Sequence, residues 1–163
     1  MAKFRSTKVF DGFSTVFRQW KAEDTHCRFI HGYGISFKIW FEGDLDDRNW
    51  VWDFGGMKRA KEKIDGRSPK EWMDFMFDHT FIIAEDDPFK ESFLKMADAQ
   101  VAQIRVVPAT GAEKFAEYIY QKVDHFVKKE TQGRVKVYQV EFKEHEKNSA
   151  IYSSYDNKAQ LEN

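Results

Sequence analysis

Residues 27–34 gather several side chains that could take part in chemistry. The stretch contains the thiol of Cys27, the guanidinium of Arg28, the imidazole of His31 and two glycines, and His26 stands just before it. A thiol is a nucleophile or base only as its thiolate, and neighbouring cations favour that form. A lone cysteine is more often an inert buried side chain, so the stretch by itself favours that interpretation of Cys27 over a catalytic one.

A second group of candidate ligands, Asp44, Asp46 and Asp47, lies in a charged turn. Calcium-binding loops need a glycine at their sharp turn and a distal glutamate, and this turn has neither at the required spacing. We therefore interpret the turn as a solvated loop.

Length and charge narrow the classes of function. The 163 residues suit one domain, and 26 basic against 27 acidic residues give no case for a nucleic-acid or membrane partner. The single cysteine cannot form an internal disulfide, and no apolar run is long enough to span a bilayer or to act as a signal peptide. We therefore expect a cytoplasmic protein.

Two segments that flank the cysteine loop have the pattern of strands. Over residues 35–42, apolar and polar side chains alternate, which predicts a strand with one buried face. Residues 8–21 are rich in β-branched and aromatic side chains, and Asp11-Gly12 indicates a bend or bulge within them. We expect the two strands to pair antiparallel and to hold the cysteine loop between them.

Residues 110–129 carry the clearest helical pattern. Apolar side chains recur there at three- and four-residue steps, and Thr110 and Glu113 have the spacing of a capping box. Residues 69–77 predict a second helix, with Ser68 as its N-cap. Further, shorter helices are predicted over residues 57–64 and 88–98.

The remaining segments predict further strands, over residues 80–84, 101–107, 134–144 and 149–154. This order of strands and helices favours an α+β fold, with an antiparallel sheet and helices on one face. We expect one domain over residues 1–154 and a polar C-terminal tail over residues 155–163.

Five landmarks together resemble the 6-pyruvoyl-tetrahydropterin synthase and 6-carboxytetrahydropterin synthase family. They occur in the family's order, and the resemblance spans roughly residues 9–152. Each landmark alone is weakly specific, so their order and spacing carry the resemblance. The landmarks are Phe13-Ser14, Cys27 with His31-Gly32, Val51-Trp52-Asp53-Phe54 with Lys58, Asp78-His79, and Glu113-Lys114-Phe115-Ala116 followed by Glu141.

The resemblance implies a fold and an assembly. The family has the tunnelling (T-) fold, in which each subunit contributes a four-stranded antiparallel sheet with helices on one face to a ring of subunits. Ring closure pairs the exposed sheet edges of neighbouring subunits. We therefore expect a homo-oligomer, and a hexamer is the usual size in the family.

The resemblance also implies roles for four residues. Cys27 matches the family's base, which moves protons on the pterin side chain, and Asp78 with His79 matches its second acid/base group. A carboxylate that accepts from imidazole fixes the tautomer and raises the basicity of the other nitrogen. Glu141 matches the carboxylate that holds the pterin ring through two acceptor oxygens. Without the resemblance, the Asp–His pair also fits a surface turn and Glu141 a solvent-facing strand position.

The match fails where the family binds zinc. The family uses three histidines, and the matching positions here are Phe17, His31 and Tyr33, so His31 is the only retained metal-ligand position. Three protein ligands are the usual minimum for a catalytic zinc, and a phenyl ring cannot ligate. We therefore hypothesise that the inherited zinc site is empty and expect no cofactor, with zinc as the one metal to test.

Three functions stay open. The first is a pterin side-chain lyase, like 6-pyruvoyl- or 6-carboxytetrahydropterin synthase, that acts on a dihydropterin triphosphate-type substrate. The second is a metal-free relative that binds a pterin or purine-like molecule and does other chemistry. The third is a non-catalytic subunit that keeps the ring. The sequence does not choose between biopterin and queuosine pathways.

Overall fold

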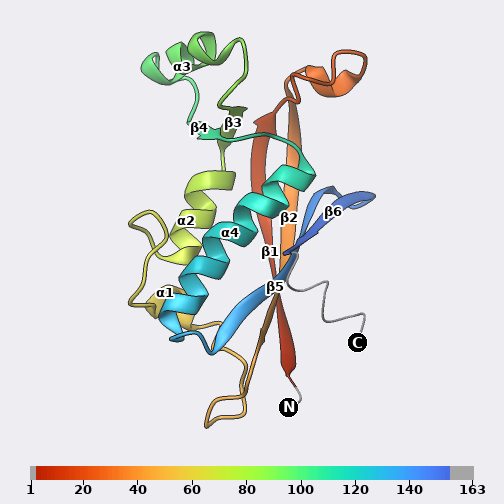
Figure 1. The fold of residues 1–163 in the computed structure, drawn as a ribbon. Coiled ribbons are helices and arrows are strands. Elements are labelled where there is room, and N and C mark those ends of the chain that lie inside the picture. Colours follow the sequence, from red (N-terminus) through yellow and green to blue (C-terminus); the bar gives the residue numbers. More distant parts are fainter. Residues whose placement is uncertain (1–2, 155–163) are drawn as a thin grey trace.

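A six-stranded sheet organises the computed structural model, which describes residues 3–154 (Figure 1). The strand order across the sheet is β4-β3-β1-β2-β5-β6. The strands are β1 (Phe4–Phe17), β2 (His31–Gly43), β3 (Thr80–Ala84), β4 (Ile104–Val107), β5 (Val135–His145) and β6 (Asn148–Ser153). The helices are the 3-10 turn η1 (His26–Arg28), α1 (Gly56–Arg59), α2 (Pro69–Phe77), α3 (Lys90–Asp98) and α4 (Ala112–Glu130).

Four of the six strands of the sheet pair antiparallel. β1 pairs with β2, β2 with β5, and β5 with β6. The predicted alternation in β2 is confirmed, because Ile35, Phe37 and Ile39 are buried and the residues between them are only half-buried. The rings of Phe13 and Phe37 stack across neighbouring strands with centroids 5.4 Å apart. This apolar face is the core of the molecule.

A bulge in β1 falls where the sequence predicts a bend. The pairing of β1 with β2 shifts register between Phe10 and Phe13, and Gly12 has a φ of 81° there. Glycine adopts a positive φ without the steric cost that a Cβ would bring. Because of the extra residue, Phe10 and Phe13 both point into the core although they are three positions apart.

The prediction of a four-stranded, wholly antiparallel sheet is wrong. β3 pairs with β1 in parallel along Thr15–Phe17, and β4 pairs with β3 in parallel, so the sheet is mixed and has six strands. All five residues of β3 are buried, which removes the alternation that marks an antiparallel strand with one solvated face. In the sequence, a short apolar run predicts a buried strand but does not indicate whether the neighbouring strand runs parallel or antiparallel to it.

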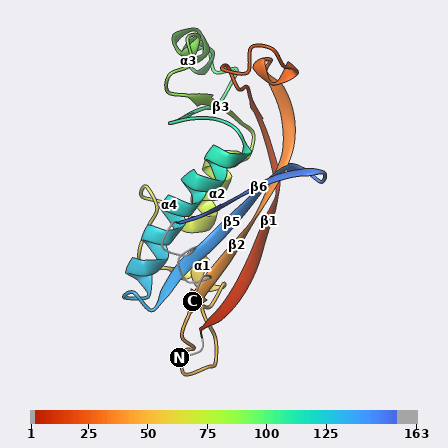
Figure 2. The ribbon, with the colours of Figure 1, turned by 45° about the vertical axis from the view of Figure 1, so that its right-hand side comes forward.

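Helices α2 and α4 cover one face of the sheet (Figure 2). α4 contributes Phe115, Ile119 and Val123 to the core, as its apolar stripe predicts. We call the other face, on which no described helix lies, the open face. None of the helices within residues 3–154 is long and apolar enough to cross a membrane.

Of the two predicted helix caps, one is confirmed and one is wrong. Ser68 caps α2, since its hydroxyl accepts from the N–H of Glu71 and the Glu71 carboxylate accepts from the N–H of Ser68. The predicted box of Thr110 and Glu113 is absent, because α4 starts after Gly111 and no side chain caps it. The Thr110 hydroxyl instead donates to the carbonyl of Arg18 at 2.6 Å. A tertiary hydrogen bond thus replaces the local one.

Other boundaries shift by a few residues. β1 begins and ends four positions before the predicted 8–21, and β2 begins four positions before the predicted start at residue 35. α1 ends at Arg59 rather than at residue 64, because the chain then turns into a bridge between Ile64 and Arg67. The predicted polar tail, 155–163, lies outside the described residues.

A buried ion pair joins the residue directly after β1 to the segment that follows β3. The guanidinium of Arg18 donates two hydrogen bonds to Asp87, at 2.6 and 2.8 Å, and Asp87 is 5% exposed. Burial alone would raise the pKa of Asp87, but Arg18 and the N–H of Phe89 hold that pKa below its usual range. The pair fixes the end of the sheet that carries α3.

Candidate functional site

Cys27 lies in the loop between β1 and β2, at the end of the sheet near α3 (Figure 1). The hydroxyl of Thr25 accepts from the N–H of Cys27 at 3.2 Å, and the carbonyl of Cys27 accepts from the N–H of Gln19 at 2.8 Å. Cys27 is a free, half-buried cysteine. The loop thus holds its backbone and leaves the thiol partly accessible.

The three positions that match the family's zinc ligands form an aromatic stack. The ring centroids of Phe17 and Tyr33 lie 4.1 Å apart, and those of His31 and Tyr33 lie 4.4 Å apart. Phe17 is fully buried and also meets Phe115 edge-on at 4.8 Å. Nδ1 of His31 lies 2.9 Å from the carbonyl oxygen of Phe29, so it donates and carries the proton of the neutral ring. We call Phe17, His31 and Tyr33 the zinc corner, and packing of their rings holds these side chains together.

The side chains of this corner do not fit zinc. Phe17 offers no lone pair, and burial raises the pKa of Tyr33, with Glu144 and Cys27 raising it further, which disfavours the phenolate that a metal needs. His31 is then the only ordinary ligand of the three. Within residues 3–154, no three or more His, Cys, Asp or Glu side chains form a group that could hold a metal ion. Loss of the zinc site remains a prediction for elemental analysis.

Glu144, near the end of β5, lies beside this corner and was not singled out by the sequence. Burial raises the pKa of Glu144 and the charge of Glu113 raises it further, whereas His145 and His31 act in the opposite direction. The backbone N–H of Ala112, the first residue of α4, lies near the Glu144 carboxylate and also acts to lower its pKa. No local pattern reveals this residue, because α4 and β5 meet only in the folded chain.

Asp78 and His79 pair directly after α2. Oδ2 of Asp78 lies 3.1 Å from Nδ1 of His79, and Ser14 of β1 binds both residues through its backbone, at 3.2 and 2.6 Å. Burial alone would raise the pKa of Asp78, but Ser14 and His79 hold that pKa below its usual range. The side chain of His79 is 77% exposed, so Nε2 is accessible from outside the chain.

The backbone of His79 is held in an uncommon conformation. Its φ is 55°, in the left-handed region that residues with a Cβ rarely adopt. Such a conformation costs on the order of 1 kcal/mol and persists only where the surroundings enforce it, often at functional sites. Here the hydrogen bond from the N–H of His79 to the carbonyl of Ser14 enforces it.

Glu141 lies on the open face of β5, opposite Lys38 of β2. Oε2 accepts from the hydroxyl of Ser149 at 3.2 Å, across the hairpin with β6. The other oxygen, Oε1, has no hydrogen bond to a described residue. The carboxylate can therefore still accept from a ligand.

Within one chain, the structure brings Asp78 and His79 together but not the whole predicted set. No hydrogen bond or ion pair among residues 3–154 joins this pair to Cys27 or to Glu141. Ser14, which binds the pair, lies opposite Gly34, whereas Glu141 lies opposite Lys38 two strands away from β1. At about 3.3 Å per residue and about 4.8 Å per strand, Glu141 is on the order of 15 Å from the Asp–His pair.

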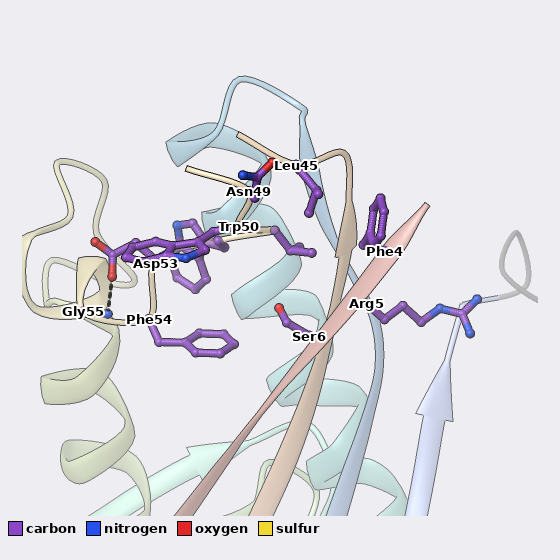
Figure 3. Close-up of a pocket in the computed structure, with 11 residues that line it drawn as sticks. Phe4, Arg5, Ser6, Leu45, Asn49, Trp50, Asp53, Phe54 and Gly55 are labelled. Atoms are coloured by element: carbon purple, nitrogen blue, oxygen red, sulfur yellow. Dashed lines mark hydrogen bonds between the residues drawn. The ribbon is translucent and has the colours of Figure 1, made fainter. Parts of the chain in front are cut away.

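An apolar pocket, which we call the aromatic pocket, lies at the other end of β1 (Figure 3). It has a volume of about 550 Å³ and includes the landmark Val51-Trp52-Asp53-Phe54. Phe4 and Ser6 of β1 form one side and Trp50 and Phe54 the other, while Asp53 accepts from the N–H of Gly55 at 2.9 Å. The aromatic side chains of this landmark therefore form one wall of the pocket.

Comparisons with solved structures agree with the fold. An uncharacterized protein, WS1659 from Wolinella succinogenes, has a TM-score of 0.75 at 22% identity, over 94% of this chain and 99% of that one. The 6-pyruvoyl tetrahydropterin synthase of Caenorhabditis elegans has a TM-score of 0.62 at 17% identity, over 94% and 97%. The enzyme of Plasmodium vivax has a TM-score of 0.59 at 13% identity, over 93% and 98%. These similarities show a shared fold.

The sequence comparisons give the family. A search of the curated proteins found no match to the chain. The family model described as 6-pyruvoyl tetrahydropterin synthase matches residues 7–154, which include Cys27, the Asp78–His79 pair and Glu141. The chain therefore belongs to the 6-pyruvoyl tetrahydropterin synthase family.

Proposed function

We propose that the protein binds a dihydropterin triphosphate-type substrate and acts on its side chain, as a lyase of the 6-pyruvoyl- or 6-carboxytetrahydropterin synthase kind. The observation that carries the proposal is the hydrogen-bonded Asp78–His79 pair, in a chain that belongs to this family. Asp78 fixes the proton of His79 on Nδ1 and leaves Nε2 as the base. Such a group can take and return a proton on the substrate side chain.

The other roles follow from chemistry at the matched positions. Cys27 is the second proton-transfer group, and its half-buried loop gives it partial access to a ligand. Glu141 accepts from adjacent N–H donors of the pterin ring through its carboxylate. Because no hydrogen bond or ion pair among residues 3–154 joins Cys27, His79 and Glu141, the proposal includes a homo-oligomeric ring in which a second copy completes each site. We propose the cytoplasm as its location.

A second candidate is a metal-free relative that binds a pterin or purine-like ring and does other chemistry or none. The stack of Phe17, Tyr33 and His31 favours it, because these side chains do not provide the three ligands for the zinc that the family's lyase chemistry uses. The aromatic pocket favours ring binding as well, since Trp and Phe faces suit a flat heterocycle.

Ligand binding tests what the two candidates share. We expect the wild-type protein to bind dihydroneopterin and the Glu141→Ala variant to bind it at least about tenfold more weakly, because a charge-assisted pair is lost. Isothermal titration calorimetry measures both, and Glu91→Ala on α3 is the control that removes a carboxylate elsewhere. Equal affinity of Glu141→Ala and wild type would remove the anchor from the proposal.

Turnover separates the two candidates. For the lyase we expect release of triphosphate from dihydroneopterin triphosphate, abolished in Cys27→Ala and reduced about a hundredfold or more in Asp78→Asn, because a general acid–base group contributes that much. Ring binding without turnover, with and without added zinc, would reject the lyase and leave the second candidate. Unchanged assembly of the variants, measured by light scattering, confirms that a loss of turnover is chemical.

A further inference from the structure

A polar pocket on the open face has no role in the function described so far. It crosses β1, β2 and β5 beside the bulge of β1 and has a volume of about 630 Å³. We call it the bulge pocket. Its lining includes Lys143 and His145 of β5, Ser36 of β2 and the backbone of Gly34.

Three hydrogen-bond donors line the bulge pocket. Lys143 makes no ion pair or hydrogen bond with any described residue, so its ammonium group is available. Nδ1 of His145 accepts from the N–H of Lys147 at 3.2 Å, which places the proton of the neutral ring on Nε2. Ser36 adds a hydroxyl, directly opposite Lys143 in the ladder between β2 and β5. An ammonium, an imidazole N–H and a hydroxyl together suit the oxygens of a phosphate.

The floor of the bulge pocket is open because it lacks side chains. A Cβ added at Gly34 or at Gly12 would meet no atom within 4 Å. A ligand can therefore approach the backbone of β1 and β2 closely at this point. At Gly34 the φ is not positive, so a residue with a side chain fits the strand there and would fill the floor.

Two carboxylates also line the pocket and limit where an anion can lie. Asp11 belongs to β1, two strands away from Lys143, and Glu146 belongs to the turn after β5. Both would repel an anion that lay against them. The favourable position is therefore beside β5 and β2, between Lys143 and Ser36.

The bulge pocket lies between the parts of the proposed site. Lys143 follows Glu141 by two residues on the same face of β5, about 7 Å along the strand. Gly34, at the floor, pairs with Ser14, the residue that binds Asp78 and His79. A molecule with its ring at Glu141 can thus extend a chain along Lys143 towards the level of His79.

We propose that the bulge pocket is an oxyanion subsite, and that it holds the phosphate chain of the substrate whose ring Glu141 anchors. The subsite rests on the proposed function for the identity of its ligand. The oxyanion chemistry itself rests on Lys143, His145, Ser36 and the open floor at Gly34.

Titration with inorganic tripolyphosphate tests the oxyanion chemistry without a pterin. We expect wild type to bind it, and Lys143→Met and Gly34→Val to bind it at least about tenfold more weakly, because a charged contact or the space is lost. Lys147→Met is the matched control, since it removes the same charge from the same hairpin, at an exposed residue outside the pocket lining. Circular dichroism checks that each variant folds. No binding by wild type, or equal losses in Lys143→Met and Lys147→Met, would overturn the subsite.

A second titration, with dihydroneopterin and dihydroneopterin triphosphate, separates the subsite from the proposed function. If both are correct, Lys143→Met weakens only the triphosphate, and Glu141→Ala weakens both ligands. If wild type binds tripolyphosphate but neither pterin, the proposed function fails and the oxyanion subsite stands with another ligand. If both pterins bind equally well to wild type and to Lys143→Met, the subsite fails and ring binding stands.

Discussion

Single residues at the zinc corner decide whether the inherited chemistry is possible. The sequence alone gives the identities at the three ligand positions, because the landmarks fix their spacing. It does not give the stack of Phe17 on Tyr33, which depends on the pairing of β1 with β2, nor Glu144, which reaches the corner from β5. Local residue types can therefore be read from the sequence, while their surroundings require the fold.

At the scale of single residues, we predict that putting histidines back at the two lost ligand positions restores zinc binding. We expect the double variant Phe17→His, Tyr33→His to bind zinc with His31, because the three side chains are neighbours at the paired ends of β1 and β2. Without metal it should be destabilised by about 2 kcal/mol, since Phe17 is buried against two rings. Added zinc should restore stability, because it binds only the folded state. Elemental analysis and thermal unfolding measure both effects.

The matched control for the zinc variant is Phe17→His alone, which provides two imidazoles. It should lose stability without a comparable response to zinc. A double variant with no more zinc than wild type would show that the corner cannot adopt ligand geometry.

At the scale of elements, the antiparallel strands and the long helix could be predicted, and the parallel strands could not. β2 and α4 carry the periods of a strand and a helix with one buried face, so their burial follows from the sequence. β3 is buried on both faces and has no such period. The cap at Ser68 is local and was predicted, whereas Thr110 bonds to Arg18, 92 positions away, which no local pattern shows.

At the scale of elements, we predict that loss of the Arg18–Asp87 ion pair destabilises the fold. Asp87→Asn leaves the guanidinium, 18% exposed, without its charged partner, and should cost about 3 kcal/mol in the free energy of unfolding. Asp74→Asn is the control, because the pair of Lys70 and Asp74 is exposed and should be worth less than about 1 kcal/mol. Urea unfolding at pH 7 measures both.

The same pair predicts a pH dependence. The pair lowers the pKa of Asp87 in the folded state, so its contribution is present above the unfolded value of about 3.9 and is lost as pH falls through the folded value. Wild type should therefore lose stability more steeply than Asp87→Asn below about pH 4. Parallel curves for the two proteins would contradict this role of the carboxylate.

At the scale of the whole molecule, the sheet has edges that a second copy can pair. β6 is the last strand, and β1 pairs with β3 only along Thr15–Phe17, so most of its length has a strand on one side alone among residues 3–154. Ile151 on β6 and Val9 on β1 are 57% and 53% exposed. Unpaired edges and exposed apolar side chains favour association with a like strand.

Assembly is therefore the prediction for the whole molecule. We expect a solution mass that is a multiple of 19.3 kDa, with a hexamer as the family's usual size, and a shift to smaller species in Ile151→Lys. Multi-angle light scattering measures the mass, and Lys147→Met in the preceding turn is the control. A monomer at micromolar concentration would contradict both the ring and the shared site.

The family could be inferred from the sequence because the landmarks extend over nearly the whole chain, and the ring stays a prediction. The bulge pocket could not, because it forms where three strands meet beside an irregular pairing. Its donor side comes from Lys143 and His145, at alternate positions of β5, a pattern that has meaning only once the open face is known.

The parallel seam between β1 and β3 has a consequence for synthesis of the chain. The hairpin of β1 and β2 is complete once Gly43 has emerged, but Thr15 must wait for Thr80, 65 residues later, before its second neighbour exists. During that interval a nascent chain presents one side of an apolar strand, the situation in which intermolecular pairing competes with folding. Lys8 and Asp11 are exposed, charged residues of this same strand, and charged side chains on an edge strand discourage such encounters between neighbours on one polysome.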